Sequence, residues 1–341
     1  MQSTRILRRP IAVFLNASRL DYDRKLDFSR LQSTCDFRRH DVDKVVDHDE
    51  ILEQVKDAHI VITKEMELSR AVFEKFPASV KLLCEAGTGY NNLPVSAARE
   101  RGVVVCNVPT YSTDAVAHMA ITYVMNLSVS MFDQQRMLLE GNRANFTGPF
   151  TLPLVEINGK TLGLVGGAGR IGSKVADIGL ALGMDIIISS RAGKFAPDHR
   201  HATNPRVTVV KDLEPLLKTS DFVSIHCPLN EQTRGSFGRT QLQQMKRSAF
   251  LINTARGAIC KEDELIECLK EGVIAGAGLD VTTTEPPLMD SEIWNLPNVW
   301  LSPHTGWRRI ETRQRLVDMT ADNIEAFCKA ENEKDMINVV N

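Results

Sequence analysis

The chain has 341 residues, enough for two domains that each bury a core. A hydrophobic fraction of 43% and a charged fraction of 25% are ordinary globular values, which argues against disorder, collagen-like repeats and a coiled coil. Forty-one basic residues nearly balance forty-three acidic ones, so we expect a small-molecule ligand rather than nucleic acid or a membrane surface. Seven cysteines without a CxxC pair indicate neither a disulfide framework nor a zinc ribbon. We therefore expect a cytoplasmic protein with no metal site.

Short β-rich runs alternate with longer amphipathic segments, which is typical of βαβ units and parallel sheets. A first group of strands is predicted at residues 11–15, 59–63, 80–84 and 103–106. A second group is predicted at residues 161–165, 185–189, 222–226, 250–253, 276–280 and 299–302. Between them, residues 113–139 lack proline and glycine and are predicted to form one long helix that begins at Ser112 or Thr113. An irregular connector is expected at 141–153, and a last helix at 310–330.

The first motif that carries chemistry follows the strand predicted at 161–165. It is a GxGxxG pattern formed by Gly167, Ala168, Gly169, Arg170, Ile171 and Gly172. Glycine permits a tight turn, allows the backbone to approach a pyrophosphate, and lets a helix N-terminus face the phosphate charge. The motif lies between a predicted strand and a predicted helix, with a second strand about 20 residues further on. This context predicts a dinucleotide-binding fold.

The end of the second strand of this fold indicates which dinucleotide is bound. The sequence there reads Ser190 and Arg191, where NAD-binding proteins of this type have a carboxylate for the ribose hydroxyls. A carboxylate would repel a 2′-phosphate, whereas a hydroxyl and a guanidinium can donate hydrogen bonds to it. NADP(H) is therefore the preferred cofactor and NAD(H) a possible one. The alternative is that Arg191 is an ordinary surface cation.

Polar residues suited to catalysis follow three of the later predicted strands. Arg256 lies in NTARGA, Asp280 and Glu285 lie in the segment GLDVTTTEPP, and His304 lies in PHTGW. Because the carboxyl ends of parallel strands meet at one edge of a sheet, these side chains can converge despite their separation in sequence. Taken singly, each could equally be a surface or structural residue. Their shared placement predicts a catalytic site.

With these motifs in this order, nearly the whole chain resembles the D-isomer-specific 2-hydroxyacid dehydrogenases, and within them the glyoxylate/hydroxypyruvate reductases and glycerate dehydrogenases. The resemblance also includes GTGYNNLPVSAARERGVVVCNVPTYSTDAVA at 87–117, which is similar to the family's substrate loop and hinge. It implies an α/β fold of two Rossmann-like, doubly wound parallel-sheet domains. Residues 1–112 and 307–341 would form a flavodoxin-like substrate domain completed by the C-terminal helix. Residues 113–306 would form the NAD(P)-binding domain.

The resemblance also implies a role for each site residue. Arg256 would hold the carboxylate and keto oxygen of the substrate, and His304 would be the general acid for the keto oxygen. Glu285 would pair with His304 and orient it. Backbone N–H groups of Thr88 and Gly89 would take the substrate carboxylate. The remaining implied contacts are Asp280 to the nicotinamide carboxamide, Trp307 as a wall of the substrate pocket, and Cys227, Pro228, Thr254 and Ala255 to the cofactor.

Three positions depart from the family pattern. Gly166 and Gly167 stand in succession, which leaves the path of the phosphate loop uncertain by one residue; His118 replaces a frequent acid, and Thr282 replaces a frequent aromatic residue. Several alternatives stay open. The enzyme could act on a bulkier 2-ketoacid or be a short 3-phosphoglycerate dehydrogenase, or the chain could be a nucleotide-sensing, corepressor-like interaction protein. A homodimer, formed through the long helix and the connector after it, is expected from the resemblance.

Overall fold

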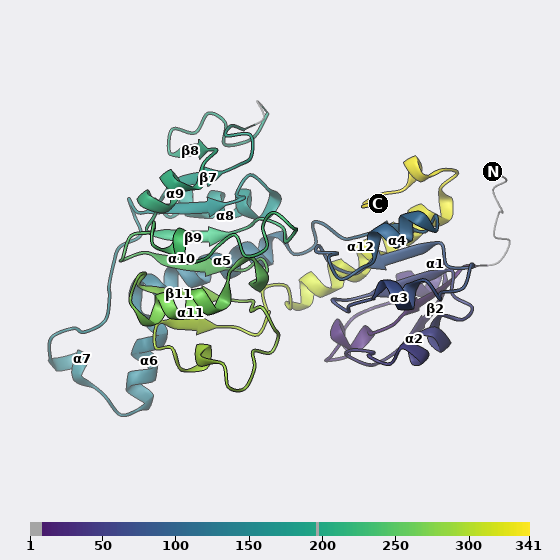
Figure 1. Ribbon diagram of the computed structural model, residues 1–341, viewed down its shortest axis with the longest axis horizontal. Coiled ribbons are helices and arrows are strands. Elements are labelled where there is room, and N and C mark those ends of the chain that lie inside the picture. Colours follow the sequence, from purple (N-terminus) through teal and green to yellow (C-terminus); the bar gives the residue numbers. More distant parts are fainter. Residues whose placement is uncertain (1–8, 196–197) are drawn as a thin grey trace. The chain divides into compact units, whose positions relative to one another are not determined.

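The computed structural model describes residues 9–195 and 198–341. The described chain forms two compact units, which are treated separately below and whose elements are labelled in Figure 1. Unit 1 consists of Met1–Ser112 together with Trp307–Asn341, and unit 2 consists of Thr113–Gly306.

Unit 1 is built on a five-stranded parallel sheet with the order β2-β1-β3-β4-β5. Its strands are β1 (Ile11–Phe14), β2 (Asp36–Arg39), β3 (Ile60–Thr63), β4 (Leu82–Glu85) and β5 (Val104–Cys106). This is the strand order of flavodoxin-like folds, so the prediction for this part of the chain is confirmed. The central strands β3 and β4 are buried along their whole length, as expected for a sheet covered on both faces.

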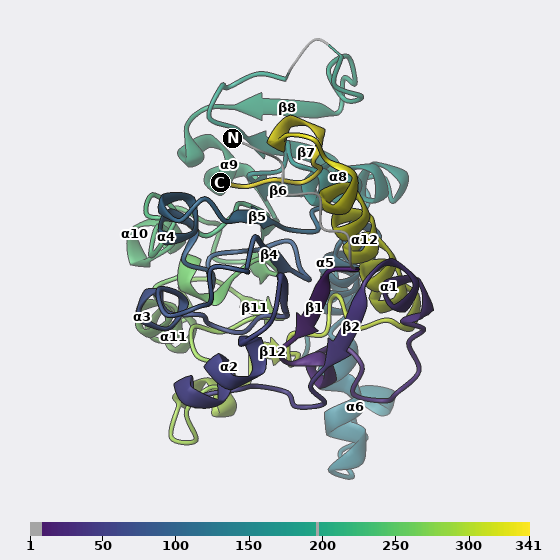
Figure 2. The same ribbon diagram turned by 90° about the vertical axis from the view of Figure 1, so that its right-hand side faces the viewer.

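Two helical layers cover the unit 1 sheet, as Figure 2 shows. The helices are α1 (Ser29–Thr34), α2 (His48–Val55), α3 (Arg70–Phe73), α4 (Val95–Glu100) and α12 (Ile310–Lys329). Alternate residues of β1 point to opposite faces, so that Phe14 packs in the core under α1 and α12, and Val13 packs in the core under α2, α3 and α4. The last long helix therefore completes unit 1, although it follows unit 2 in the sequence.

Unit 2 is built on a seven-stranded parallel sheet with the order β12-β11-β10-β9-β6-β7-β8. Its strands are β6 (Thr161–Val165), β7 (Asp185–Ser189), β8 (Val207–Val210), β9 (Phe222–Ile225), β10 (Phe250–Asn253), β11 (Gly276–Leu279) and β12 (Val299–Leu301). The order reverses between β6 and β9, which is the switch point at which doubly wound sheets bind their ligands. The Rossmann-like prediction is confirmed.

Helices cover both faces of this sheet as well. The helices of unit 2 are α5 (Thr113–Val129), α6 (Met131–Leu139), α7 (Ala144–Thr147), α8 (Arg170–Ala181), α9 (Leu213–Thr219), α10 (Arg239–Leu242) and α11 (Glu262–Lys270). Of these, α6 and α7 contain no buried residue and extend away from the sheet (Figure 1). Residues of α5 and α8 pack on one face in a core that includes Val124 and Val175. Residues of α9, α10 and α11 pack on the other, with Leu216 and Leu265 in its core.

The prediction of one continuous helix over 113–139 is wrong. The chain forms α5 and α6, whose axes differ by 63°. The break falls at Ser130, which has a left-handed φ of 49° and donates its hydroxyl to the Pro153 carbonyl at 2.7 Å. The Asn126 side chain accepts the backbone N–H of Phe132 across the same break. Side-chain hydrogen bonds to the backbone thus replace the helical ones at this point.

No single helix among the described residues is long and apolar enough to cross a bilayer, although the bent pair α5 and α6 passes that test jointly.

Two strands of the structure were not predicted from the sequence. β2 (DFRR) and β8 (VTVV) lie at the edges of their sheets and contain no fully buried residue. The polar residues of β2 hide its strand pattern, as is common at sheet edges. β8 is mostly apolar but only four residues long.

Candidate active site and cofactor loop

The turn after β6 shows which glycines the dinucleotide motif uses. Gly166 has a left-handed φ of 73°, and a Cβ on it would lie 2.8 Å from the Cβ of Cys227. Gly167 packs against the first turn of α8, because a Cβ on Gly172 would lie 2.4 Å from the Cα of Gly167. The extra glycine therefore makes the turn, and the next one provides the close approach of helix to loop.

The N-terminus of α8 has the features of an anion site. Gly169 is its N-cap, with an extended backbone and no side chain to accept the first N–H groups. Ala168, Gly169 and Arg170 are exposed, whereas Ile171 is half-buried. The first N–H groups of a helix have no partner within it and attract negative charge through the helix dipole. A pyrophosphate fits this position.

Ser190 and Arg191 lie directly after β7, next to that turn. The backbone N–H of Gly166 donates to the Ser189 hydroxyl at 3.3 Å, and the N–H of Ser190 donates to the Val210 carbonyl at 3.0 Å. These bonds fix the end of β7 relative to the phosphate turn. Arg191 is exposed, so its guanidinium is accessible to a ligand.

On the other side of the switch point, β9 and β10 end in further predicted cofactor residues. Cys227 and Pro228 follow β9, where Cys227 is half-buried and Pro228 is exposed; Ala255 follows β10 and is half-buried. The Thr254 hydroxyl is buried and has no hydrogen-bond partner among the described residues. Buried hydroxyls are normally paired, so this oxygen fits a ligand contact. Together with the glycine turn, it makes this edge suitable for a dinucleotide.

His304, the predicted general acid, is in contact with Glu285, the residue predicted to orient it. The Nδ1 atom of His304 lies 2.8 Å from a carboxylate oxygen of Glu285, and the other oxygen of Glu285 accepts the backbone N–H of Thr282 at 3.4 Å. His304 has a left-handed φ of 51°, which is rare for a residue with a side chain and occurs at functional sites. Its backbone N–H donates hydrogen bonds to the carbonyls of Asp280 and Ser302, each at 2.9 Å.

Arg256 reaches the same edge from β10. Its backbone carbonyl accepts the Asn253 side chain at 2.9 Å. The next residue, Gly257, packs so closely on Thr282 that a Cβ would lie 2.0 Å from the Thr282 carbonyl carbon. Since Thr282 also holds Glu285, the structure brings the Arg256 segment and the Glu285–His304 pair together at the carboxyl edge of the unit 2 sheet. The threonine that departs from the family pattern thus contributes its backbone here.

Asp280 anchors the loop that carries His304. Its carboxylate, in a residue only 2% exposed, accepts the Ser302 hydroxyl at 2.5 Å and the backbone N–H groups of Thr305 and Gly306, each at 2.8 Å. The Ser302 hydroxyl also lies 2.7 Å from the hydroxyl of Tyr123 in α5. The contact implied for Asp280, to a nicotinamide carboxamide, stays a prediction. The sequence analysis did not predict that Ser302 and Tyr123 belong to the site, because neither residue is part of a functional motif.

Replacing Asp280 by alanine is expected to lower the free energy of unfolding of the cofactor-free protein by about 3 kcal/mol or more. Three donors would lose a buried acceptor, and each such loss costs about 1–3 kcal/mol. Urea unfolding of the variant and of the exposed control Asp290→Ala tests this. If the variant and the wild type were equally stable, Asp280 would have no structural role and could act only by contacting a ligand.

The predicted substrate residues of unit 1 lie at the carboxyl end of β4 and at the start of the C-terminal segment. Thr88 donates its hydroxyl to the Val108 carbonyl at 3.1 Å, and its own carbonyl accepts the Asn107 side chain at 2.7 Å. These bonds fix the loop that contains Gly89. Trp307 is 3% exposed and packs in the core under α12, yet its indole N–H has no partner among the described residues.

Comparison with known proteins shows the family and the fold of the chain. The family model "D-isomer specific 2-hydroxyacid dehydrogenase, NAD binding domain" matches residues 121–306. A hydroxypyruvate reductase of Blautia hydrogenotrophica is 32% identical over 318 residues, which are 93% of this chain and 95% of that protein.

Two solved structures match nearly the whole chain. An acyclic imino acid reductase in complex with NADPH and D-Arg has a TM-score of 0.83 at 26% identity, with 97% of this chain and 99% of that chain covered. An NADPH-dependent glyoxylate/hydroxypyruvate reductase of Sinorhizobium meliloti, in complex with NADP and malonate, has a TM-score of 0.80 at 26% identity, with 97% of both chains covered.

Proposed function

Because the chain belongs to the D-isomer specific 2-hydroxyacid dehydrogenase family, whose members reduce 2-ketoacids with NAD(P)H, we propose that it reduces a small 2-ketoacid, glyoxylate or hydroxypyruvate, with NADPH. The product would be the D-2-hydroxyacid. The observation that carries the proposal is the contact of 2.8 Å between His304 and Glu285 at the carboxyl edge of the dinucleotide-type sheet.

In the proposed reaction, the backbone N–H groups of Thr88 and Gly89 bind the substrate carboxylate, and Arg256 binds the carboxylate and the keto oxygen with its forked donors. Glu285 accepts the Nδ1 proton of His304, so the imidazole presents Nε2 to the keto oxygen and donates its proton there. The carboxylate also stabilises the imidazolium before transfer. NADPH, when bound, supplies the hydride to the keto carbon.

The preference for NADPH follows from Ser190 and Arg191 at the end of β7. Replacing Arg191 by glutamine is expected to lower the ratio of kcat/KM with NADPH to kcat/KM with NADH by about tenfold or more, since a charge-assisted hydrogen bond contributes about 1.5–3 kcal/mol. Activity with NADH should stay within about twofold. Arg206→Gln, which removes an exposed arginine paired with Asp185, serves as the matched control. An unchanged ratio would make Arg191 a plain surface cation.

A steady-state panel tests the substrate assignment. Oxidation of NADPH and NADH is followed with glyoxylate, hydroxypyruvate, 3-phosphohydroxypyruvate and a branched 2-ketoacid as acceptors. We expect kcat/KM to be highest for glyoxylate or hydroxypyruvate with NADPH. Preference for the phosphorylated or branched acid would favour a 3-phosphoglycerate dehydrogenase or a reductase of bulkier acids. Binding of the dinucleotide without turnover of any acid would favour a nucleotide sensor.

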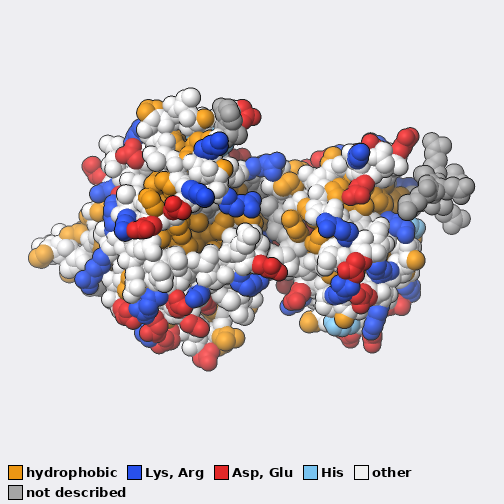
Figure 3. All heavy atoms as spheres, turned by 45° about the horizontal axis from the view of Figure 1, so that its top comes forward, with side chains coloured by type: hydrophobic (Ala, Val, Ile, Leu, Met, Phe, Trp, Pro, Cys, Tyr) orange, Lys and Arg blue, Asp and Glu red, His pale blue; other side chains and the backbone are white. Residues whose placement is uncertain are grey.

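We also propose that the protein is a cytoplasmic homodimer. The arm formed by α6, α7 and the connector exposes large apolar side chains, among them Leu139, Phe146 and Phe150, and Figure 3 shows hydrophobic side chains at its outer tip. Phe146 and Phe150 also line a groove of about 170 Å³ with Met137. A patch of this kind marks an interaction surface, and a second copy of the chain is its proposed occupant.

Sedimentation equilibrium is expected to give twice the chain mass of 38.0 kDa. The double variant Leu139→Glu/Phe146→Glu, which places two charges on the exposed arm, should sediment as a monomer with its helical content retained. Val46→Glu, a change at an exposed apolar residue of unit 1, is the control and should leave the mass unchanged. A monomeric wild type would contradict the dimer.

A further inference from the structure

A buried ammonium group lies in unit 1 and is not explained by the roles given so far. Lys64 directly follows β3 and is 1% exposed, with its Nζ atom 2.7 Å from a carboxylate oxygen of Glu65. Burial lowers the pKa of Lys64, but the neighbouring acidic groups, Glu65 first among them, more than offset this and leave the pKa above its usual value. The contact with Glu65 thus favours the charged form of this side chain inside the unit.

The ammonium lies against the aromatic residue that is expected to wall the substrate pocket. Its Nζ atom is 3.9 Å from the centroid of the Trp307 ring, within the range of a cation–π interaction. The indole N–H of Trp307 is itself buried and has no hydrogen-bond partner among the described residues. A cation and a buried, unused donor thus occur side by side.

The same ammonium lies under the loop that is proposed to bind the substrate carboxylate. A Cβ on Gly87 would lie 3.5 Å from Nζ of Lys64, and Gly87 is followed at once by Thr88 and Gly89. The backbone N–H of Val108 donates to the Gly87 carbonyl at 2.8 Å and holds the loop in place. Lys64, Trp307 and this loop all belong to unit 1, so their juxtaposition is internal to one compact body.

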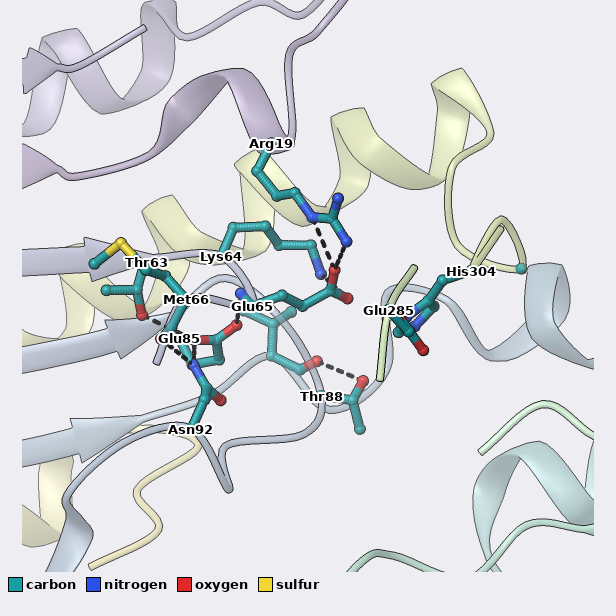
Figure 4. A network of polar contacts seen from close by, with 12 residues as sticks. Arg19, Thr63, Lys64, Glu65, Met66, Glu85, Thr88, Asn92, Glu285 and His304 are labelled. Carbon is teal, nitrogen blue, oxygen red and sulfur yellow. Dashed lines mark hydrogen bonds and ion pairs between the residues drawn. The ribbon is translucent and has the colours of Figure 1, made fainter. Parts of the chain in front are cut away.

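The neighbouring carboxylates have hydrogen-bond donors besides Lys64. Glu65 also binds Arg19, at 3.1 Å, as Figure 4 shows. Glu85 accepts the Thr63 hydroxyl, the Glu65 backbone N–H and the Asn92 side chain, each at 2.8 Å. Each acid therefore has other donors, and the ammonium of Lys64, which donates to Glu65 and also faces the buried Glu85, has N–H groups left that could bind a ligand.

We propose that Lys64 is a specificity-determining substrate residue: its ammonium attracts the substrate carboxylate bound at Thr88 and Gly89, and the Trp307 N–H donates to a substrate oxygen beside it. The pocket then selects anionic 2-ketoacids over uncharged carbonyl compounds. This inference rests on the proposed function for the reaction, but the binding of an anion can be tested without turnover.

The test compares a charged substrate with its uncharged ester. Lys64→Met keeps the length of the side chain and removes its charge. We expect kcat/KM for glyoxylate to fall by about tenfold or more, the loss of one charge-assisted contact, while kcat/KM for methyl glyoxylate changes by less than about twofold. Equal losses for acid and ester would overturn the proposal.

A second variant separates substrate binding from folding. Lys64→Met/Glu65→Gln removes both members of the buried ion pair, so Glu65 is not left as a carboxylate without its ammonium partner. If Lys64 serves only the fold, the double variant recovers the selectivity for glyoxylate over its ester; if it binds substrate, selectivity stays low. Arg19→Met, which removes the other cation on Glu65, is the control and should retain wild-type selectivity.

Calorimetric titration with oxamate in the presence of NADP⁺ gives a readout independent of turnover. The dissociation constant is expected to rise about tenfold or more in Lys64→Met. A wild type that reduces no 2-ketoacid but binds oxamate through Lys64 would contradict the proposed function and leave this inference standing. A wild type that reduces glyoxylate, with oxamate affinity equal in both proteins, would overturn the inference alone.

Discussion

Replacement of His304 by alanine is expected to lower kcat for 2-ketoacid reduction by about 10²–10⁴, the usual contribution of a general acid. The keto oxygen would then have to take its proton from water, while the proposed contact of Arg256 with the substrate would remain. Steady-state kinetics with NADPH measures the loss. KM for the ketoacid should change little in comparison.

Two further measurements sharpen this prediction. The dissociation constant for NADPH should stay within about twofold, since the dinucleotide contacts lie on other segments. Glu285→Gln keeps the shape of the side chain but removes the charge that faces Nδ1 of His304, and should cost less than removal of the imidazole itself. A variant without His304 that turns over at the wild-type rate would remove this residue from the mechanism.

Replacement of Arg256 by methionine is expected to lower kcat/KM for glyoxylate by about 10²–10⁴. Two charge-assisted hydrogen bonds, each contributing about 1.5–3 kcal/mol, would be lost. Arg256→Lys should recover only part of the loss, because a single ammonium cannot reproduce the forked geometry of a guanidinium. The measurement is kcat/KM for each variant at saturating NADPH.

The control for this position is Arg247→Met, which removes an exposed arginine of the same unit whose side chain donates to the Gly272 carbonyl. It should match the wild type in kcat/KM and in thermal midpoint. If Arg256→Lys were fully active, bidentate recognition would be wrong and a simple positive charge would suffice.

Much of the fold was open to prediction because buried strands leave a strong local signal. The central strands of both sheets are mostly apolar, and the glycine motif marks the turn into α8. The break between helices α5 and α6 could not be predicted in the same way. The break occurs at Ser130, whose hydroxyl donates a hydrogen bond to the carbonyl of Pro153, 23 positions away. No local sequence pattern indicates such a distant partner.

The site shows the same division. Arg256, Glu285 and His304 each follow a strand with a recognisable local sequence, and the structure places them at one sheet edge. Ser302 and Tyr123 act through contacts between distant segments, since the tyrosine lies on an apolar helix face that reads as core. Lys64 has no motif at all, and only its burial beside Trp307 and Gly87 reveals it.

The most direct test of the central claim is the reduction of hydroxypyruvate with NADPH by the wild-type protein, followed by chiral analysis of the glycerate formed. We predict stoichiometric oxidation of NADPH and D-glycerate as the product, with a kcat/KM about tenfold or more above that with NADH, which corresponds to about 1.4 kcal/mol of differential transition-state stabilisation. L-glycerate, or no reduction of hydroxypyruvate or glyoxylate with either cofactor, would contradict the assignment.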